Sequence, residues 1–582
     1  MYWPIAAPKI YAASKQTAHK KTTTTDDGLQ DLEPRDASKP SLGSSDLLRS
    51  EDNGDHGEET LLQNSEATRK EVAEVEEPEE RRQSVQDNHT IVGMKVARSG
   101  HLFATITRSS LSIWQTKPTV LLATIARSEH SLNTYGPNVC LLLRPDALII
   151  VVQTQLGYLI TYSLATAPNA RVYQTQLQHH GGSHARRPSA DGIRKFSVAQ
   201  SDQGPGEGDG IPEVNIRFRM VIRIDAGISK ALVVDEELIV ATQKPAAVQC
   251  IRWSPDRSGS SHSTELLKRM PWLTEKATIV NMIFDRPMNF HAWITGDGDV
   301  YAVQRLSGAK ADPANPKTLF RGYCFHRAAN EDLQAAVTAI NARFSLIAVG
   351  CADASVQVYT AKDYLGNIPL SHTLRLPVSL LSSGKLEFLS YSPDGYCLFV
   401  GFEKGWATWS VYGKPGASSF TADHTLSKVN NEMWLHGAKD GFWVGAGCEI
   451  VLLSPHTDQI CLLEMARSSA TGCYAFANIG RSLIQASTSV MLYRGFDLPD
   501  VTAVPGEHSL WQTVQLPLSY LANQWPVRST VISADGRYVA VAGRRGLAHY
   551  SVGSGRWKTF DDYRAENEFT VRGVYAGTST FS

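Results

Sequence analysis

The chain has 582 residues, of which 42% are hydrophobic and 20% are charged. Its 57 Lys and Arg nearly balance its 58 Asp and Glu, which gives a formal net charge of −1. So much apolar material excludes a wholly disordered protein, and a net charge near zero gives no reason to expect nucleic acid as a partner. The length predicts about three to five domains of ordinary size, or fewer large ones.

The N-terminal part of the chain carries the acidic excess. Between Asp26 and Asp87 there are 19 acidic and 7 basic residues, a net charge of −12, so the remainder carries +11. Residues 14–89 are polar and poor in aromatic side chains. They cannot bury enough apolar surface to offset chain entropy, and we predict a disordered acidic insertion there. The basic remainder indicates scattered solvated charges or, alternatively, an acidic partner or an anionic membrane face.

From residue 90 to residue 573 the chain repeats one pattern about nine times. Each unit has a strand with alternating apolar residues, a turn that often holds Pro-Asp or Asp-Gly, a second strand, another turn and a third strand. Such turns are typical of tight antiparallel hairpins. The nine units span residues 91–114, 138–164, 228–253, 279–303, 334–359, 385–411, 433–453, 472–493 and 527–552.

The spacing of the units, about 45 to 60 residues, is that of four-stranded propeller blades whose outer strand lies in the variable linker. We therefore predict an all-β fold, a WD40-like β-propeller of about seven to nine degenerate blades, over residues 90–573. Residues 1–13 are predicted to be an N-terminal strand of this propeller. A flexible loop is expected at about 177–214 and an atypical tail at 574–582. Since a ring has four to eight blades, either one or two units are false or the last begins a second propeller.

The eight cysteines and the hydropathy pattern bear on compartment. No cysteine lies in a C-x-x-C pair, and most occur within apolar runs, which favours a reducing compartment such as the cytosol. No window of 18 apolar residues is free of charge. We expect no transmembrane segment, so any membrane association would be peripheral.

Catalytic motifs are missing from the sequence. Walker, G-x-S-x-G and H-E-x-x-H patterns are all absent, so we predict no catalytic chemistry, no cofactor and no metal site. His179, His180 and His184 could be metal ligands, but their Gly- and Ser-rich context favours a solvated loop. Asp297 and Asp299 resemble part of a calcium loop, but a hairpin turn is favoured because the spacing and the terminal Glu are missing.

Other residues are expected to be structural. Asp146, Asp394 and Asp535 occupy turn positions, where an Asp side chain bonds the nearby backbone. Trp406 and Trp409 are three residues apart in a strand, so they should point to opposite faces and pack between blades.

Arg544 and Arg545 are the candidate partner-binding residues. They are adjacent on a short turn of a well-defined unit. A turn at a propeller face is where a rigid scaffold presents binding residues. The alternative is that both are solvated turn charges.

Three segments resemble the ribosome control protein (Ric-one) family. They are the start MYWPIAAPKIY, the unit YGPNVCLLLRPDALIIVVQTQLGYLITYSL and the stretch STVISADGRYVAVAGRRGLAHYSVGSGRWKTF. The run AVAGRRGLAHYS followed by GRWKTF is the most specific of these. The resemblance covers residues 1–11 and roughly 91–573, and leaves the acidic insertion outside.

The resemblance implies a role in GTPase activation. Members of the family are large subunits of a two-protein guanine nucleotide exchange factor for the Golgi GTPase Rab-six (Ypt-six in yeasts), with an Rgp-type partner subunit. This implies a cytoplasmic protein, peripheral at the Golgi membrane, in endosome-to-Golgi retrograde transport. The family continues into a helical C-terminal part that this sequence is expected to lack. The alternative is an interaction propeller of another coat or tether complex without exchange activity.

Overall fold

The computed structural model describes the N-terminal residues 2–12 and most of the chain from residue 90 to residue 571. The predicted insertion at 14–89 and the tail at 574–582 lie outside the described residues, as does most of the loop at 177–214, of which residues 211–214 instead belong to a strand. The described ranges are 2–12, 90–172, 211–254, 261–274, 277–306, 318–363, 366–422, 432–455, 459–470, 476–493 and 511–571.

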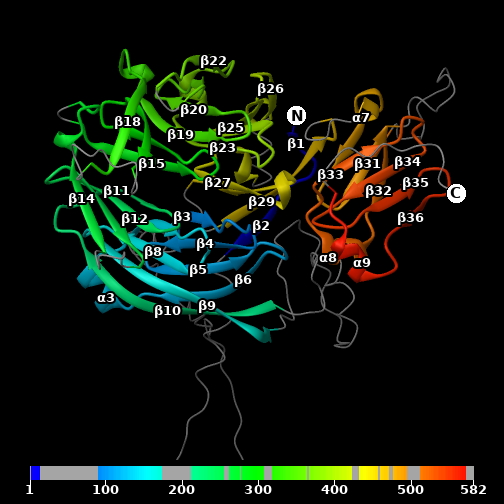
Figure 1. Ribbon diagram of the computed structural model, residues 1–582, viewed down its shortest axis with the longest axis horizontal. Helices are drawn as coiled ribbons and strands as arrows, with labels where there is room; N and C mark the ends of the chain where they lie inside the picture. The colour runs from blue at the N-terminus through cyan, green and yellow to red at the C-terminus, as the bar shows by residue number, and fades with distance from the viewer. Residues whose placement is uncertain are drawn as a thin grey trace, which may run out of the picture.

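Seven four-stranded antiparallel blades form a closed ring in the first body; six are separate sheets, and the seventh is part of an eight-stranded sheet that extends beyond the ring (Figure 1). The first strand of each sheet contacts the first strand of the next, and the contact between the seventh and first sheets closes the circle. Blade one comprises β3 (Ile91–Val96), β4 (Leu102–Thr107), β5 (Ser110–Gln115) and β6 (Val120–Ala126). Blade two comprises β7 (Asn138–Leu143), β8 (Ile149–Thr154), β9 (Tyr158–Val172) and β10 (Ile211–Arg223). Blade three comprises β11 (Ile228–Val233), β12 (Glu237–Thr242), β13 (Ala247–Arg252) and β14 (His262–Leu266).

The next three blades repeat the same order of strands from the centre outward. The predicted WD40-like propeller is therefore confirmed. Blade four comprises β15 (Ile279–Asp285), β16 (Phe290–Thr295), β17 (Val300–Arg305) and β18 (Phe320–His326). Blade five comprises β19 (Ala335–Asn341), β20 (Leu346–Cys351), β21 (Val356–Thr360) and β22 (Leu370–Leu374). Blade six comprises β23 (Leu386–Tyr391), β24 (Cys397–Phe402), β25 (Gly405–Ser410) and β26 (Pro415–Ser418).

The seventh blade combines both ends of the first body. Its first three strands are β27 (Asp440–Val444), β28 (Glu449–Leu453) and β29 (Gln459–Ser468). Its fourth strand is β2 (Lys9–Ala12), which pairs antiparallel with β29. The N-terminus therefore closes the ring, and β1 (Tyr2–Pro4) pairs with the end of the same strand.

Two more sheets form a second body beside the ring, so all nine repeat units are real and the last two lie outside the first propeller (Figure 1). Strand β29 runs into this body, where its end pairs with β30. The strands are β30 (Leu483–Gln485), β31 (Ser489–Tyr493), β32 (Trp511–Gln515), β33 (Ser529–Ile532), β34 (Tyr538–Ala542), β35 (Ala548–Ser551) and β36 (Arg556–Lys558).

Helices are short throughout the described residues. The second body has α7 (Phe476–Gly480), α8 (Leu518–Gln524) and α9 (Tyr563–Glu568). The first body has α3 (Glu129–Tyr135), α5 (Leu380–Ser383) and the 3-10 turns η1 (Leu267–Arg269), η3 (Glu331–Leu333), η4 (Ser419–Thr421), η5 (Met433–Leu435) and η6 (Gly445–Gly447). None of the helices in the described ranges is long and apolar enough to span a membrane.

The eighth repeat unit differs from its predicted pattern. We expected its first strand near residues 472–478, where the described part of the chain forms α7. Asn478 explains the helix, because its side-chain amide donates to the carbonyl oxygens of Ser469 at 3.0 Å and Thr530 at 2.9 Å. Its Oδ1 accepts from the backbone N–H of Ile532 at 2.9 Å. One side chain thus fixes α7 to β33.

The core lies between neighbouring blades. Trp406 packs with Phe399 and Trp443 between blades six and seven, whereas Trp409 packs with Val356 between blades five and six. The prediction that the two tryptophans face opposite sides of their strand is confirmed. The seven cysteines in the described residues are all free thiols, and five of them are buried.

We expect the buried His291 to make the fold sensitive to acid. It lies on β16 with 3% of its surface exposed, between the rings of Phe284 and Phe320. Burial, and to a smaller extent the charge of Arg305, lowers the pKa of His291 to about 3. An unfolded histidine titrates near about 6.5, so the stability that neutral His291 provides is complete above that pH and is lost as the pH falls towards 3.

We expect the free energy of unfolding to fall by about 2 kcal/mol between pH 6.5 and pH 5 through this residue, at up to ~1.4 kcal/mol per pH unit. The variant His291→Phe keeps an aromatic ring at this site, and its free energy of unfolding should fall less steeply between pH 6.5 and pH 5. Urea unfolding at several pH values measures this. Parallel curves for the wild-type and variant proteins would contradict the assignment.

Candidate functional site

The turn between β34 and β35 carries the two arginines that the sequence singles out. Helix α8 holds the backbone of this turn. Gln524 accepts the Arg544 N–H with its carbonyl oxygen at 2.7 Å and the Arg545 N–H with Oε1 at 3.0 Å. The hydroxyl of Tyr520 accepts the N–H of Gly543 at 2.8 Å. The backbone is therefore fixed while both guanidinium groups remain exposed.

The two arginines face different neighbours. Arg545 donates from its guanidinium to Oγ1 of Thr570 at 2.7 Å, within the second body. Arg544 lies near His101, on the turn between β3 and β4 of the first propeller. Partial burial and, secondarily, the charge of Arg544 lower the pKa of His101. Arg544 therefore borders the seam between the two bodies, and the partner-binding role of both residues stays a prediction.

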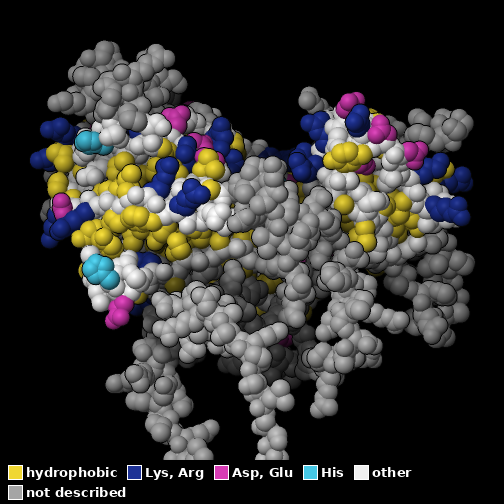
Figure 2. All heavy atoms as spheres, turned by 90° about the horizontal axis from the view of Figure 1, so that it is seen from below, with side chains coloured by type: hydrophobic (Ala, Val, Ile, Leu, Met, Phe, Trp, Pro, Cys, Tyr) yellow, Lys and Arg dark blue, Asp and Glu magenta, His cyan; other side chains and the backbone are white. Residues whose placement is uncertain are grey.

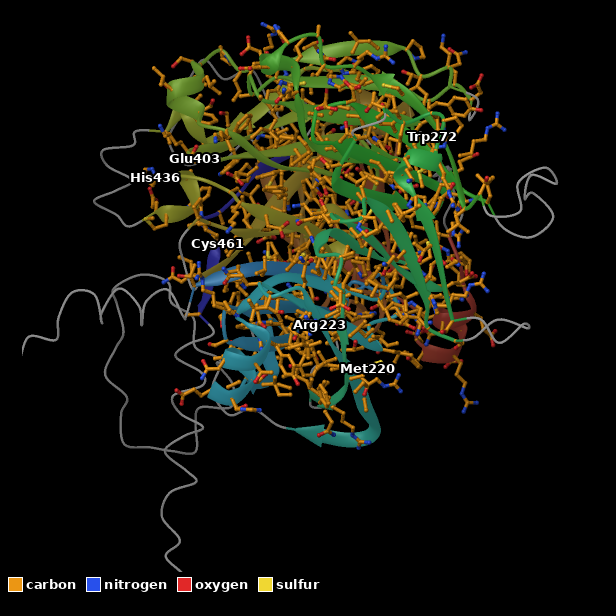
Figure 3. The ribbon with its side chains drawn as sticks, turned by 90° about the vertical axis from the view of Figure 1, so that its left-hand side faces the viewer. Met220, Arg223, Trp272, Glu403, His436 and Cys461 are labelled. Atoms are coloured by element: carbon orange, nitrogen blue, oxygen red, sulfur yellow. The ribbon has the colours of Figure 1, made fainter. Side chains whose placement is uncertain are left out.

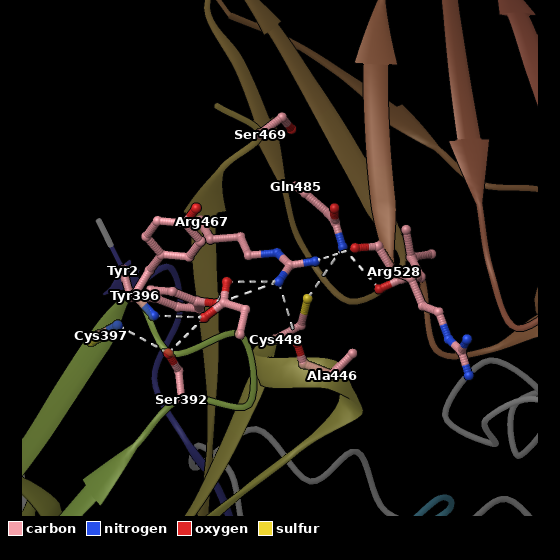
Figure 4. Close-up of polar contacts among 12 residues, drawn as sticks. Tyr2, Ser392, Tyr396, Cys397, Ala446, Cys448, Arg467, Ser469, Gln485 and Arg528 are labelled. Carbon is pink, nitrogen blue, oxygen red and sulfur yellow. Dashed lines mark hydrogen bonds and ion pairs between the residues drawn. The ribbon is translucent and has the colours of Figure 1, made fainter. Parts of the chain in front are cut away.

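A buried ion pair lies at this seam (Figure 4). Arg467, at the end of β29, contacts Oδ2 of Asp394 at 3.1 Å. The exposed fractions of the two side chains are 5% and 11%. The hydroxyl of Tyr2 donates to the same carboxylate oxygen at 2.5 Å. Arg467 also donates to the carbonyl oxygens of Arg528 at 2.6 Å and Ala446 at 3.4 Å.

This arrangement joins four parts of the chain. Asp394 belongs to blade six, Ala446 to blade seven, Tyr2 to the N-terminal strand and Arg528 to the second body. Burial is the main cause of a raised pKa of Tyr2, so its hydroxyl stays a hydrogen-bond donor at neutral pH. The charges of Arg467 and Asp394 compensate each other in a site that excludes water.

Asp394 also makes the local contacts that its turn position predicts. Its Oδ1 accepts from the hydroxyl of Ser392 at 2.7 Å and from the N–H of Tyr396 at 3.2 Å. Asp535 makes the same two contacts in its own turn, with Ser533 and Arg537. The two Ser-x-Asp-Gly sequences are alike, so the local pattern does not reveal that Asp394 alone binds a buried arginine.

A second ion pair, within the first propeller, lies beside the seam. Lys117, between β5 and β6, contacts Oε1 of Glu449 at 2.9 Å and lies 5.6 Å from the ring centroid of Trp525. Burial, the largest single cause, acts to lower the pKa of Lys117, but the charge and hydrogen bond of Glu449 together with nearby charges outweigh it, so the pKa is raised. In addition, Nε2 of Gln485, in the second body, donates to Sγ of Cys448 in blade seven at 3.6 Å. The junction thus contains packed polar contacts from both bodies.

The structure describes some of the residues that the sequence suggested as metal ligands. His179, His180 and His184 lie outside the described residues. Asp297 and Asp299 lie in the hairpin between β16 and β17, as the favoured interpretation predicted, and Asp299 accepts the N–H of Ala328 at 2.9 Å. Among the residues whose placement is described, His, Cys, Asp and Glu form no group of three suited to a metal ion.

Comparison with known proteins relates the chain to one family. A family model described as the RIC1 second beta propeller domain matches residues 486–576, which include β31 to β36. The guanine nucleotide exchange factor subunit RIC1 of Mus musculus is 25% identical over 551 residues, which cover 82% of this chain and 36% of the mouse protein. The Schizosaccharomyces pombe subunit ric1 is 22% identical over 542 residues, which cover 81% of this chain and 49% of that protein.

The chain is therefore similar to RIC1 proteins over about four-fifths of its length. The resemblance seen in the sequence is thereby confirmed. The chain spans about a third to a half of the length of these RIC1 relatives.

Among solved structures, the beta-propeller domain of Myceliophteria thermophila Cps50 (Swd1) matches with 9% identity and a TM-score of 0.40, covering 64% of this chain and 96% of that one. Saccharomyces cerevisiae Sqt1 matches with 9% identity and a TM-score of 0.40, covering 65% of this chain and 96% of that one.

Proposed function

We propose that this chain is the propeller part of a guanine nucleotide exchange factor subunit that acts on a Rab-six-like GTPase with an Rgp-type partner. The observation that carries the proposal is the match to proteins named as exchange factor subunits over about four-fifths of the chain, through both bodies. The proposed place of action is the cytoplasmic face of the Golgi, in retrograde transport from endosomes.

A scaffold of this kind needs no catalytic side chain. An exchange factor binds the nucleotide-free GTPase more tightly than the GDP-bound form. The exchange factor therefore lowers the affinity of the GTPase for nucleotide by the same factor by which bound nucleotide lowers the affinity of the GTPase for the exchange factor. The chain would hold the binding surfaces of its two bodies in a fixed orientation relative to each other. The junction around Arg467 supports this role because it ties the second body to two blades of the first.

The test is the release of a fluorescent GDP analogue from a purified Rab-six-like GTPase. We expect the chain together with an Rgp-type subunit to accelerate release, or to assemble with that subunit and require the remainder of the protein for activity. Failure of the chain to bind either protein, with recovery of coat or tether subunits from cell lysate instead, would favour the alternative of an interaction propeller.

Reversing the charge of Arg544 and Arg545 tests the candidate site. The double variant Arg544→Glu, Arg545→Glu should weaken capture of the Rgp-type subunit or the GTPase about tenfold or more, since like charges in an interface cost several kcal/mol. The control is Arg556→Glu with Lys558→Glu on β36, where both side chains are also exposed. If the two double variants capture the partner proteins equally well, Arg544 and Arg545 are solvated turn charges and not partner-binding residues.

A further inference from the structure

Strand β10 forms the outer edge of blade two, and it has an unusual surface. It is the outermost strand of its sheet, at the lower rim of the first propeller. Figure 3 labels Met220 and Arg223 on this rim. Seen from below, hydrophobic side chains form a band across the first propeller, with Lys and Arg around it (Figure 2). As the outermost strand of its blade, β10 lies on the outside of the ring.

Apolar and basic side chains alternate along this strand. Phe218 and Met220 are 60% and 53% exposed. Arg217, Arg219 and Arg223 are exposed beside them. We call these five residues the β10 rim.

A β-bulge sets the direction of these side chains. Phe218 pairs with Tyr162 and Met220 with Thr161, so Arg219 is the extra residue of the bulge. The ring centroids of Phe218 and Tyr162 are 6.3 Å apart, which holds Phe218 at the surface of the blade. Paired residues share a face of the sheet, and the neighbours Thr161 and Tyr162 point to opposite faces, so Phe218 and Met220 lie on the two opposite faces of this edge strand.

Protection of a sheet edge explains only part of this surface. Charged side chains and bulges commonly prevent an edge strand from pairing with another chain, and the β10 rim has both. The same bulge interrupts the row of backbone groups that an added peptide strand would need. Edge protection does not require two large apolar side chains that are each more than half exposed, and these remain to be explained.

The charge around the rim is positive. Within residues 214–225, all of which the structure describes, the single carboxylate is that of Asp225, and it pairs with Arg223 at 2.7 Å. Among the described residues, neither Arg217 nor Arg219 has a carboxylate within ion-pair distance. An outer edge strand with an exposed apolar side chain on each face and arginines beside them matches the chemistry of an anionic bilayer that meets the strand edge-on, where arginines contact phosphates and apolar side chains enter the interface.

We propose that the β10 rim is a docking surface for an anionic lipid bilayer. Phe218 and Met220 insert between headgroups from the two faces of the strand, while Arg217 and Arg219 bind lipid phosphates and Arg223 stays paired with Asp225. Each arginine near such a surface strengthens binding about fivefold, and the contribution falls as salt is added. The assignment does not depend on exchange activity or on the identity of the GTPase.

Vesicle sedimentation of the whole chain tests the assignment. The wild-type chain should bind vesicles of phosphatidylcholine with phosphatidylserine and should not bind vesicles of phosphatidylcholine alone. The variant Phe218→Ser, Met220→Ser should bind about tenfold more weakly, because two inserted side chains are lost. The variant Arg217→Glu, Arg219→Glu should lose at least about 25-fold, from two arginines at fivefold each.

Two control variants match these changes on other surfaces. Leu381→Ser with Tyr412→Ser removes side chains that are 85% and 74% exposed on blade six. Arg556→Glu with Lys558→Glu reverses two exposed charges on β36. Both controls should bind vesicles like the wild-type chain. An equal loss in the controls would show that overall charge or hydrophobicity governs binding, which overturns the proposal.

Hydrogen exchange provides a readout that needs no variant. Vesicles with phosphatidylserine should slow amide exchange in residues 214–223 of the wild-type chain. Absence of vesicle binding, or binding without protection of these residues, would overturn the assignment. So would binding of soluble polyglutamate that is as strong as vesicle binding and unaffected by Phe218→Ser, Met220→Ser, since that result identifies an acidic polypeptide as the partner.

Discussion

A chain that lacks residues 1–12 is expected to lose the folded first propeller. Strand β2 is the fourth strand of blade seven, and its removal exposes the edge of β29. The deletion also removes Tyr2 and Tyr11, which are 1% and 6% exposed. Loss of a large buried aromatic side chain costs about 3–5 kcal/mol, so two such losses approach the whole stability of a typical domain. Limited proteolysis and thermal unfolding of the soluble fraction measure the effect.

The control for this deletion lies in the same segment. Ile5, between β1 and β2, is 38% exposed, so Ile5→Ser should change the free energy of unfolding by less than about 0.5 kcal/mol. A synthetic peptide of residues 1–12 should restore protease resistance to the truncated chain, and a scrambled peptide should not. An unchanged thermal transition after the deletion would show that the ring is held by the contacts of its blades alone.

The repeat pattern of the sequence was sufficient to predict the blades, because it depends on neighbouring residues. Alternation along each strand and turns such as Ser392 to Gly395 are local signals, and all nine predicted units form sheets. The partition into seven blades and two further sheets was left open. It is decided by the pairing of Lys9–Ala12 with Gln459–Leu462, about 450 residues apart, and four residues carry too little pattern to identify such a partner.

The candidate site was less predictable for the same reason. The sequence places Arg544 and Arg545 on a turn, which is correct, but their separate neighbours depend on α8 and on the first propeller. Arg467 was not singled out at all, since a single arginine at the end of an apolar strand resembles a solvated charge. Its burial results from three segments that meet at the seam, and no local spacing encodes that.

Replacement of Arg467 by Met is expected to destabilise the protein by about 3–5 kcal/mol, because it leaves the carboxylate of Asp394 buried without its charge partner. The loss should be greatest at the seam, since Arg467 is also bonded to the carbonyl oxygens of Ala446 and Arg528. Scanning calorimetry should therefore show the second body unfolding before the first.

Arg528→Met is the matched control for this prediction. Arg528 contributes its backbone carbonyl to the network, and its side chain is exposed, so the substitution keeps the contact and removes an equal charge. The double variant Arg467→Met, Asp394→Asn should recover part of the stability, because no unpaired charge remains buried. If Arg467→Met and Arg528→Met had the same small effect, the ion pair would contribute nothing to the junction. The two bodies would then be held by other contacts, such as that of Lys117 with the ring of Trp525 and that of Gln485 with Cys448.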